Sequence, residues 1–335
     1  SPLPSFLSTV PVPSLFSLCI PSCLVVLLFL LLPSTVAYTM MPTDEEIASV
    51  ARAQQSMPSS SADQQRVLHL LATHPCLGTP ALRLALVRSL RPSSYTVDSA
   101  ANSILVEQTF VAELECGSAS EAQRALTAME AAFPAKVSPK TSLYQAQYAA
   151  GTGDVAKADE LLVDAIARFP TSSKLAAARV SLHRDAGHLD TALQLAGDYT
   201  THYPSDADGW LEAAELYATA GSLDRALFCI DQTLLLRPTS VGVWTRKGEL
   251  CYTAGGPANV RAAATAFARA VELTNDSRLD MRAMWSLYVA LRRGGGPAGG
   301  PTRALALEVG KRITAAYADK CPSLLAAAED VISTI

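Results

Sequence analysis

The stretch GHLDTALQLAGDYTTHYP, residues 187–204, opens with a glycine, has an alanine five residues later and ends on a proline. The same three residues recur 34 positions earlier and 34 positions later, as Gly153, Ala158 and Pro170, and as Gly221, Ala226 and Pro238. Self-similarity at a fixed period of this length is the sequence signature of stacked structural repeats. The stretch therefore predicts one helical unit of a solenoid.

Each of the three residues has a physical role in such a unit. Gly187 has no Cβ and can end a first helix in a left-handed turn. Ala192 is small enough to let the second helix lie close against the first. Pro204 stops the second helix because it lacks a backbone N–H and clashes with the preceding turn. The spacing thus predicts helix, tight turn, helix and stop within 34 residues.

The pattern extends beyond the regular repeats with small changes of length. Upstream, Gly117, Ala122 and Pro134 repeat it at an offset of 36, which predicts two extra loop residues near Val137. Downstream, we expect a longer turn from Tyr252 to Pro257 before the second-helix pattern returns at Phe267 and Ala270, and a further first helix from Met281 to Tyr288. A period of 34 is that of tetratricopeptide repeats. The chain is predicted to be an all-α, tetratricopeptide-repeat superhelical solenoid of about five helical pairs.

We expect five segments along the chain. They are an apolar leader at 1–39, N-terminal helices at 40–97, the repeat solenoid at 98–293, a flexible Gly/Pro insertion at 294–301 and C-terminal helices at 302–335. Within the second segment, Thr43 and Glu46 form a capping box, and Thr79 with Pro80 predicts another helix start.

The leader resembles a signal peptide in part. An apolar run from Leu24 to Leu32 precedes small residues that end at Ala37, but no Lys or Arg stands before Arg52. Two methionines, Met40 and Met41, follow directly. We interpret residues 1–39 as a gene-model extension, with a signal or anchor segment as the alternative.

We therefore predict that residues 1–39 are dispensable. Sequencing the N-terminus of the endogenous protein should find Met40 or Met41, or the residue after it. A mature end at Tyr38, or an intact leader, would instead favour the secretory pathway.

Composition and motifs argue against several function classes. The net charge of −4 and the pI near 5.8 do not favour a general nucleic-acid binder. The five cysteines after the leader share no metal-ligand spacing, so we expect reduced, buried thiols. No arrangement of nucleophile, base and orienting group is present in the sequence. We expect a protein that is not an enzyme, with no catalytic residue, no cofactor, no metal and no small-molecule substrate.

First-helix side chains are predicted to form a concave groove that binds partners. With Ser173 as the first residue of a repeat, groove positions are the second, fifth, ninth and twelfth. The polar and aromatic residues best placed there are Lys174, Arg184, Glu215, Glu249, Tyr252 and Arg282. No asparagine occurs at these positions, so the carboxylate clamp of chaperone-binding repeat domains is not predicted. Tyr252 and Arg282 are the strongest candidates because these residue types dominate interface energies.

One part of the chain is more specific than a generic repeat. Five segments resemble, in order and spacing, the family of subunit 2 of the endoplasmic reticulum membrane protein complex: Trp210–Tyr217, Ala226–Cys229, Tyr252–Gly256, Phe267–Ala270 and Met281–Tyr288. The resemblance implies a non-catalytic scaffold on the cytoplasmic face of the endoplasmic reticulum membrane, attached peripherally through the other subunits, both membrane-embedded and cytosolic. That complex supports insertion of tail-anchored and multipass proteins. The alternatives are a soluble co-chaperone or general adaptor, and a secreted repeat protein if the leader is real.

Overall fold

The computed structural model describes residues 44–55, 58, 60–73, 79–90, 100–116, 118–274, 280–294, 301–320 and 322–334. The described chain consists of α-helices, one short 3-10 helix and the turns between them, so the all-α fold class is confirmed. The chain divides into two compact units, 1–165 and 166–335. The predicted leader and residues 295–300 of the predicted insertion lie outside the described residues.

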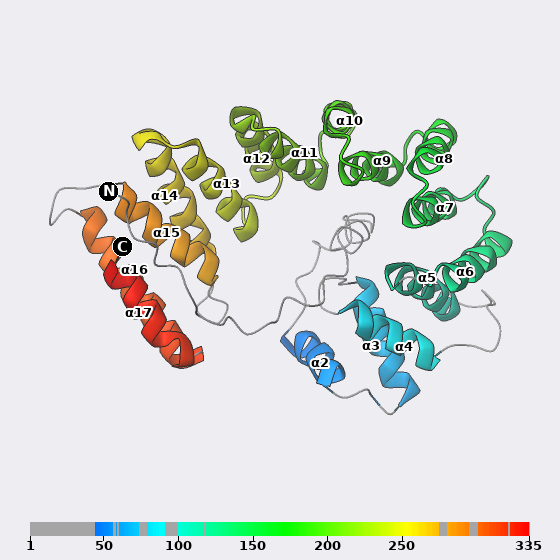
Figure 1. The fold of residues 1–335 in the computed structure, drawn as a ribbon, viewed down its shortest axis with the longest axis horizontal. Helices are drawn as coiled ribbons and strands as arrows, with labels where there is room; N and C mark the ends of the chain where they lie inside the picture. The colour runs from blue at the N-terminus through cyan, green and yellow to red at the C-terminus, as the bar shows by residue number, and fades with distance from the viewer. Residues whose placement is uncertain are drawn as a thin grey trace, which may run out of the picture. The chain divides into compact units, whose positions relative to one another are not determined.

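The first unit begins with the three helices expected before the repeats. Its helices are α2 (Asp44–Gln55), α3 (Ser61–Thr73), α4 (Pro80–Leu90), α5 (Ala100–Glu115), α6 (Ala119–Ala132), α7 (Pro139–Gly151) and α8 (Val155–Arg168), the last of which ends in the second unit (Figure 1). The Thr79 hydroxyl accepts a hydrogen bond from the Leu82 amide at 3.2 Å, which confirms the predicted cap.

These N-terminal helices share one hydrophobic core with α5. Val50, Leu71, Leu86 and Leu105 are buried together in it. At the same interface, Arg83 of α4 donates to both carboxylate oxygens of Glu115 at 3.0 and 3.1 Å, with both side chains almost fully buried. The core therefore joins residues on both sides of position 97, where the sequence predicts a domain boundary.

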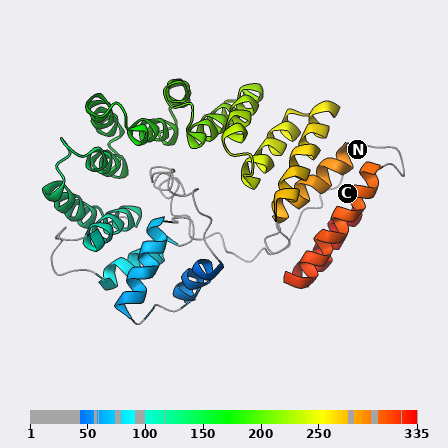
Figure 2. The same ribbon diagram turned by 180° about the vertical axis from the view of Figure 1, so that it is seen from behind.

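The second unit continues the pattern of paired helices. They are α9 (Ser173–Asp185), α10 (Leu189–His202), α11 (Ala207–Thr219), α12 (Leu223–Leu236), α13 (Val241–Ala254), α14 (Gly256–Leu273), α15 (Met281–Arg293) and α16 (Pro301–Lys320), followed by η3 (Pro322–Leu324) and α17 (Leu325–Thr334). Helices that are adjacent in sequence from α9 to α16 pack side by side in both views (Figures 1 and 2). The first helices α13 and α15 also contact each other directly.

The glycines that close the first helices have the predicted left-handed conformation. Gly153, Gly187 and Gly221 have φ of 91°, 79° and 76°. At Gly187 the turn is closed by two backbone hydrogen bonds, from the Gly187 amide to the Arg184 carbonyl and from the His188 amide to the His183 carbonyl. This is the double bond pattern of a Schellman motif, and it satisfies carbonyls that the end of the helix leaves unpaired.

The alanines of the pattern lie at helix crossings with no exposed surface. Ala158, Ala192 and Ala226 are each 0% exposed, as predicted. Around Ala192, the side chains of Val180 and Leu216 complete a core that α9, α10 and α11 share. A larger side chain at this position has no room without displacing its neighbours, because Ala192 is fully enclosed in this packed core.

The two predicted departures from the 34-residue period have different outcomes. Six residues, 133–138, connect α6 to α7, whereas four residues, 169–172, connect α8 to α9, so the two extra loop residues are confirmed. The longer turn expected between Tyr252 and Pro257 is wrong. Gly255 alone separates α13 from α14, and the added residues instead extend α14 to 18 residues. Gly255 and Gly256 both have positive φ, which permits such a short connection.

Tryptophans attach the start of two first helices to the loop before them. The indole N–H of Trp210 donates to the Pro204 carbonyl at 2.8 Å, and Trp244 donates to the Pro238 carbonyl at the same distance. Proline ends the preceding helix, and its carbonyl would otherwise lack a partner in the protein. The tryptophan therefore fixes the direction in which each new repeat begins.

We predict that Ala192→Phe overpacks the crossing of α9 and α10 and lowers the free energy of unfolding by about 1–3 kcal/mol. Chemical denaturation followed by circular dichroism measures the change. Ala262→Phe is the matched control, because Ala262 is exposed on α14. Equal stability of the two variants would contradict the assignment of Ala192 to a tight crossing.

Candidate partner-binding site

All six predicted groove residues lie in the second unit, on first helices. Lys174 is exposed at the start of α9, and Arg282 stands at the start of α15 with a side chain that is 69% exposed. Arg184 of α9, Glu215 of α11, and Glu249 and Tyr252 of α13 are half-buried. The predicted groove positions at Ser181 and Thr245 are buried, so they cannot contact a partner.

Arg246 of α13 is hydrogen-bonded to two glutamates that link α13 to its neighbours α11 and α15. Its guanidinium donates to both oxygens of Glu215 on α11, at 2.6 and 2.5 Å, and to Glu249 one turn along α13 at 3.1 Å. Glu249 in turn accepts from Arg282 Nε on α15 at 2.7 Å. The hydrogen bonds to Glu215 are the main reason that the pKa of Arg246 is raised above its ordinary value.

Arg184 makes the corresponding link between α9 and α11. Its Nε donates to Asp185 Oδ1 at 3.0 Å, and its Nη1 donates to Glu212. Burial raises the pKa of the Glu212 carboxyl, and the Arg184 guanidinium opposes that rise. Burial raises the pKa of Asp185 in the same way. One guanidinium therefore stabilises two partly desolvated carboxylates.

Together these groups form two ion-pair networks, Arg184–Glu212 between α9 and α11 and Glu215–Arg246–Glu249–Arg282 from α11 to α15, which both reach α11. We call the two networks together the ion-pair row; its members are Arg184, Glu212, Glu215, Arg246, Glu249 and Arg282. Four of the six predicted residues are members of the row or bound to it. Their side chains connect neighbouring first helices.

The other two predicted residues differ from the row. The Arg293 guanidinium of α15 lies over the Tyr252 ring of α13, with 4.7 Å between the guanidinium carbon and the ring centroid. This is a cation–π contact between the two helices. The Lys174 ammonium makes no hydrogen bond or ion pair with any other described residue. Lys174 is thus the predicted residue with the most unused bonding capacity.

Sequence reasoning missed Arg246 and Glu212. Each stands one helical turn from a predicted residue, Arg246 before Glu249 and Glu212 before Glu215. Their opposite charges at offsets of 28 to 33 residues, close to the repeat period, are the signal that could have found them. Side chains one repeat apart on first helices become neighbours once the repeats stack.

The cysteines correct one expectation. Cys229 and Cys251 are buried as expected, and burial raises the pKa of the Cys229 thiol to about 11, which keeps it protonated. Cys116, however, is exposed at the end of α5. Burial of part of its thiol and the neighbouring Glu115 and Glu113 raise its pKa above the ordinary value. A raised pKa disfavours the reactive thiolate.

Within the described ranges, no three His, Cys, Asp or Glu side chains are arranged to hold a metal ion. No helix in the described part of the chain is long and apolar enough to cross a bilayer.

Comparisons with known proteins add little. No protein-family model matches the chain, and no curated protein does. Among solved structures, the MamA RS-1 ArsTM double mutant is similar at 17% identity and a TM-score of 0.41, covering 52% of this chain and 97% of that one. MamA MSR-1 is similar at 20% identity and a TM-score of 0.38, covering 52% and 98%. MamA 41-end from Desulfovibrio magneticus RS-1 is similar at 17% identity and a TM-score of 0.39, covering 51% of this chain and 94% of that one. At these values the similarity carries no functional conclusion.

We predict that the Glu215–Arg246 pair contributes a coupling free energy of about 0.5–1 kcal/mol, since it is bidentate and partly shielded from water. A double-mutant cycle with Glu215→Ala and Arg246→Ala measures it by denaturant unfolding at low and high salt. The Arg269–Glu272 pair of α14, more exposed at both ends, is the control and should couple by less. A coupling no larger than that of the control would show that the row does not join the repeats.

Proposed function

We propose that this protein is a non-catalytic scaffold that binds protein partners along the first helices of its second unit. The observation that carries the proposal is the ion-pair row, whose two networks link charged side chains of four first helices through α11. Arg282 is the most exposed cation of the row, and the same first helices carry the exposed Lys174 and the half-buried Tyr252 ring. Arg and Tyr supply a large share of the energy in protein interfaces.

The internal pairing of these residues is compatible with binding. Exposed ion pairs contribute only about 0–1 kcal/mol each, so a partner carboxylate can compete for an arginine at small cost. Arg282 uses its Nε and Nη2 on Glu249, and its planar fork has further N–H donors. The row can therefore keep the repeats in register before binding and offer donors to a partner.

More specifically, we propose that the scaffold is the subunit 2 type component of an endoplasmic reticulum membrane protein complex. The support is the resemblance of Trp210–Tyr217, Tyr252–Gly256 and Met281–Tyr288 to that family. Two of these segments contain Tyr252 and Arg282, the strongest groove candidates. The partners would be the other subunits of the complex, and the chain would reach the cytoplasmic face of the membrane through them. It would thereby support insertion of tail-anchored and multipass proteins.

We predict that Arg282→Glu, combined with Lys174→Glu, releases these partners. Affinity purification of the tagged full chain from its native cell, followed by quantitative mass spectrometry, should find integral membrane subunits in fixed ratio with the wild type and reduced by about tenfold or more with the double variant, the ratio that about 1.4 kcal/mol of lost affinity gives. Both substituted side chains are exposed, so we expect the fold to be retained with only a small drop in melting temperature, caused by loss of the Arg282–Glu249 pair.

Glu249→Gln is the control for the structural role of the pair. It removes the negative charge of Glu249, and with it the ion pair to Arg282, but keeps the cation, while Arg246 retains Glu215. Glu249→Gln should therefore retain the partners. If it releases them as strongly as the double variant, or if the double variant retains them at wild-type levels, the groove is not the docking surface. Wild-type purification without integral membrane subunits would contradict the proposed complex but leave the scaffold role to other partners.

A further inference from the structure

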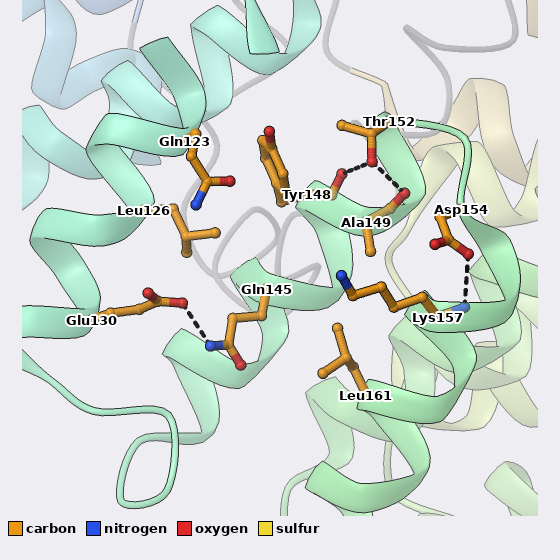
Figure 3. A pocket seen from close by; sticks show the side chains of 10 residues that line it. All are labelled: Gln123, Leu126, Glu130, Gln145, Tyr148, Ala149, Thr152, Asp154, Lys157 and Leu161. Atoms are coloured by element: carbon orange, nitrogen blue, oxygen red, sulfur yellow. Dashed lines mark hydrogen bonds between the residues drawn. The ribbon is translucent and has the colours of Figure 1, made fainter. Parts of the chain in front are cut away.

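The side chains around the cavity of the first unit have mixed charges. This cavity of about 250 Å³ lies between α6, α7 and α8, and Glu130, Asp154 and Lys157 all line it (Figure 3). Glu130 accepts a hydrogen bond from the Gln145 side-chain amide at 2.6 Å, and Asp154 accepts one from the Lys157 backbone amide at 3.1 Å. The lining therefore gives no preference for an acidic or a basic occupant.

Helix α15 of the second unit differs, because its charged side chains are all of one sign. It contains three arginines, Arg282, Arg292 and Arg293, and no Asp or Glu. Asp280 stands just before the helix as its N-cap, and its carboxylate accepts from the Arg282 and Ala283 backbone amides at 2.9 and 3.3 Å. Those amides already stabilise the charge of Asp280. The surface of α15 therefore favours anionic groups.

Two of these arginines stand at the two ends of one face of α15. Arg282 and Arg293 are eleven residues apart, and eleven residues turn an α-helix by roughly 20° more than three full turns. Ser286 and Val289 lie on the same face between them, and both are half-buried. The two arginine positions are about 16 Å apart along the helix axis. We call this face the α15 stripe; it consists of Arg282, Ser286, Val289 and Arg293.

Helix α13 contacts the arginines at both ends of the α15 stripe. Glu249 accepts from Arg282 Nε at 2.7 Å, but the same carboxylate also accepts from Arg246, so two guanidiniums share it. At the other end, the exposed Arg293 lies over the Tyr252 ring. Arg293 makes no ion pair or hydrogen bond with another described residue. The stripe thus has two exposed guanidiniums, and the carboxylate that α13 places beside them is already shared.

The Tyr252 ring prepares Arg293 for binding. The cation–π contact between them restricts the long arginine side chain, so less rotamer freedom is lost when a ligand binds. The N–H donors of Arg293 remain available to an acceptor, since none of them is used within the described chain. At the other end, the Arg282 side chain is 69% exposed and has N–H donors beyond the two that it uses on Glu249.

We propose that the α15 stripe binds an acidic segment of a protein partner, with one carboxylate at Arg282 and a second at Arg293. The proposal rests on the scaffold function proposed above and names the chemistry of the partner. Carboxylates about five residues apart in an extended chain match the separation of the two arginines, at about 3.3 Å per residue. Arginine can donate two parallel hydrogen bonds to a carboxylate, which favours an acidic side chain over a neutral one. A small apolar side chain between the two acids would cover Val289.

The test is a fluorescence polarisation titration of the full chain against three labelled peptides of equal length. The first has two Glu residues five positions apart with Ala between them, the second has Gln at both positions, and the third has the two Glu residues side by side. We expect the first to bind in the micromolar to about 1 mM range. The Gln peptide should bind at least about fivefold more weakly, because both charge-assisted hydrogen bonds are lost. The third should bind at least about threefold more weakly, because its adjacent acids reach only one arginine.

Variants locate the binding. Arg293→Glu should weaken the first peptide by about tenfold or more, because a repulsive charge replaces a donor. Tyr252→Leu should weaken it by about threefold through loss of the cation–π contact, whereas Tyr252→Phe keeps the ring and should restore most of the affinity. Arg261→Glu makes the same charge reversal at an exposed arginine of α14 and should change the affinity by less than about twofold. Melting temperatures of all four variants check that the helices remain folded.

Several outcomes would overturn the inference. They are no binding of the first peptide up to about 1 mM, equal binding of the Gln peptide, or equal effects of Arg293→Glu and Arg261→Glu. Equal binding of the peptide with adjacent acids would contradict the use of both arginines by one segment. Binding of the chain to anionic lipid vesicles that Arg293→Glu abolishes, without peptide binding, would assign the stripe to a membrane surface instead.

Failure of this inference can be told from failure of the scaffold function. If the peptides show no acidic preference but the Arg282→Glu and Lys174→Glu double variant still releases the native partners, the scaffold function stands and the chemistry of the partner is wrong. If the first peptide binds as expected but the double variant retains the native partners, the stripe binds acidic peptides and the proposed scaffold function fails.

Discussion

The close approach of paired helices at alanine is the constraint on which the rest of the structure depends. At Ala158, Ala192 and Ala226 the side chain has no exposed surface, so each methyl group is fully enclosed by the paired helices and their neighbours. Dispersion and burial at such a contact fall quickly if the helices separate by even a fraction of an ångström. The crossing therefore fixes both the distance and the rotation of each helix within its pair. The positions of residues farther from the crossing, including the charged side chains, depend on that distance and rotation.

The ion-pair row shows this dependence. Arg246 reaches Glu215 across 31 residues of chain, and Arg282 reaches Glu249 across 33. Such contacts are possible only because successive first helices repeat with nearly the same rotation. The tryptophan hydrogen bonds to the Pro204 and Pro238 carbonyls help to orient α11 and α13 by holding each helix to the loop before it. The core determines where the first helices lie, and the polar contacts then link each one to the next.

Local rules explain what could be predicted. Gly187 and Ala192 were recognisable because a left-handed turn and a tight crossing each accept few residue types, so sequence alone identifies them. The cap at Thr79 follows the same logic. The pairing of Arg184 with Glu212 could not be predicted this way, because it depends on how two repeats stack rather than on neighbouring residues. The prediction of a long turn between Tyr252 and Pro257 was wrong because a pair of glycines suits a long turn as well as a helix start.

The entry of α14 shows where the repeat can change its length. Ala263, Phe267 and Ala270 stand 37 residues after Ala226, Ile230 and Thr233, yet both sets are buried at equivalent crossings. At 18 residues against the 14 of α12, α14 is four residues longer toward its N-terminus, about 6 Å at 1.5 Å per residue, while the connection before it shortens to Gly255. What recurs along this chain is thus the pair of contacting faces, not the number of residues that leads to them. A helix entry lies outside those faces, and it can accept or lose a turn while the core on either side stays the same.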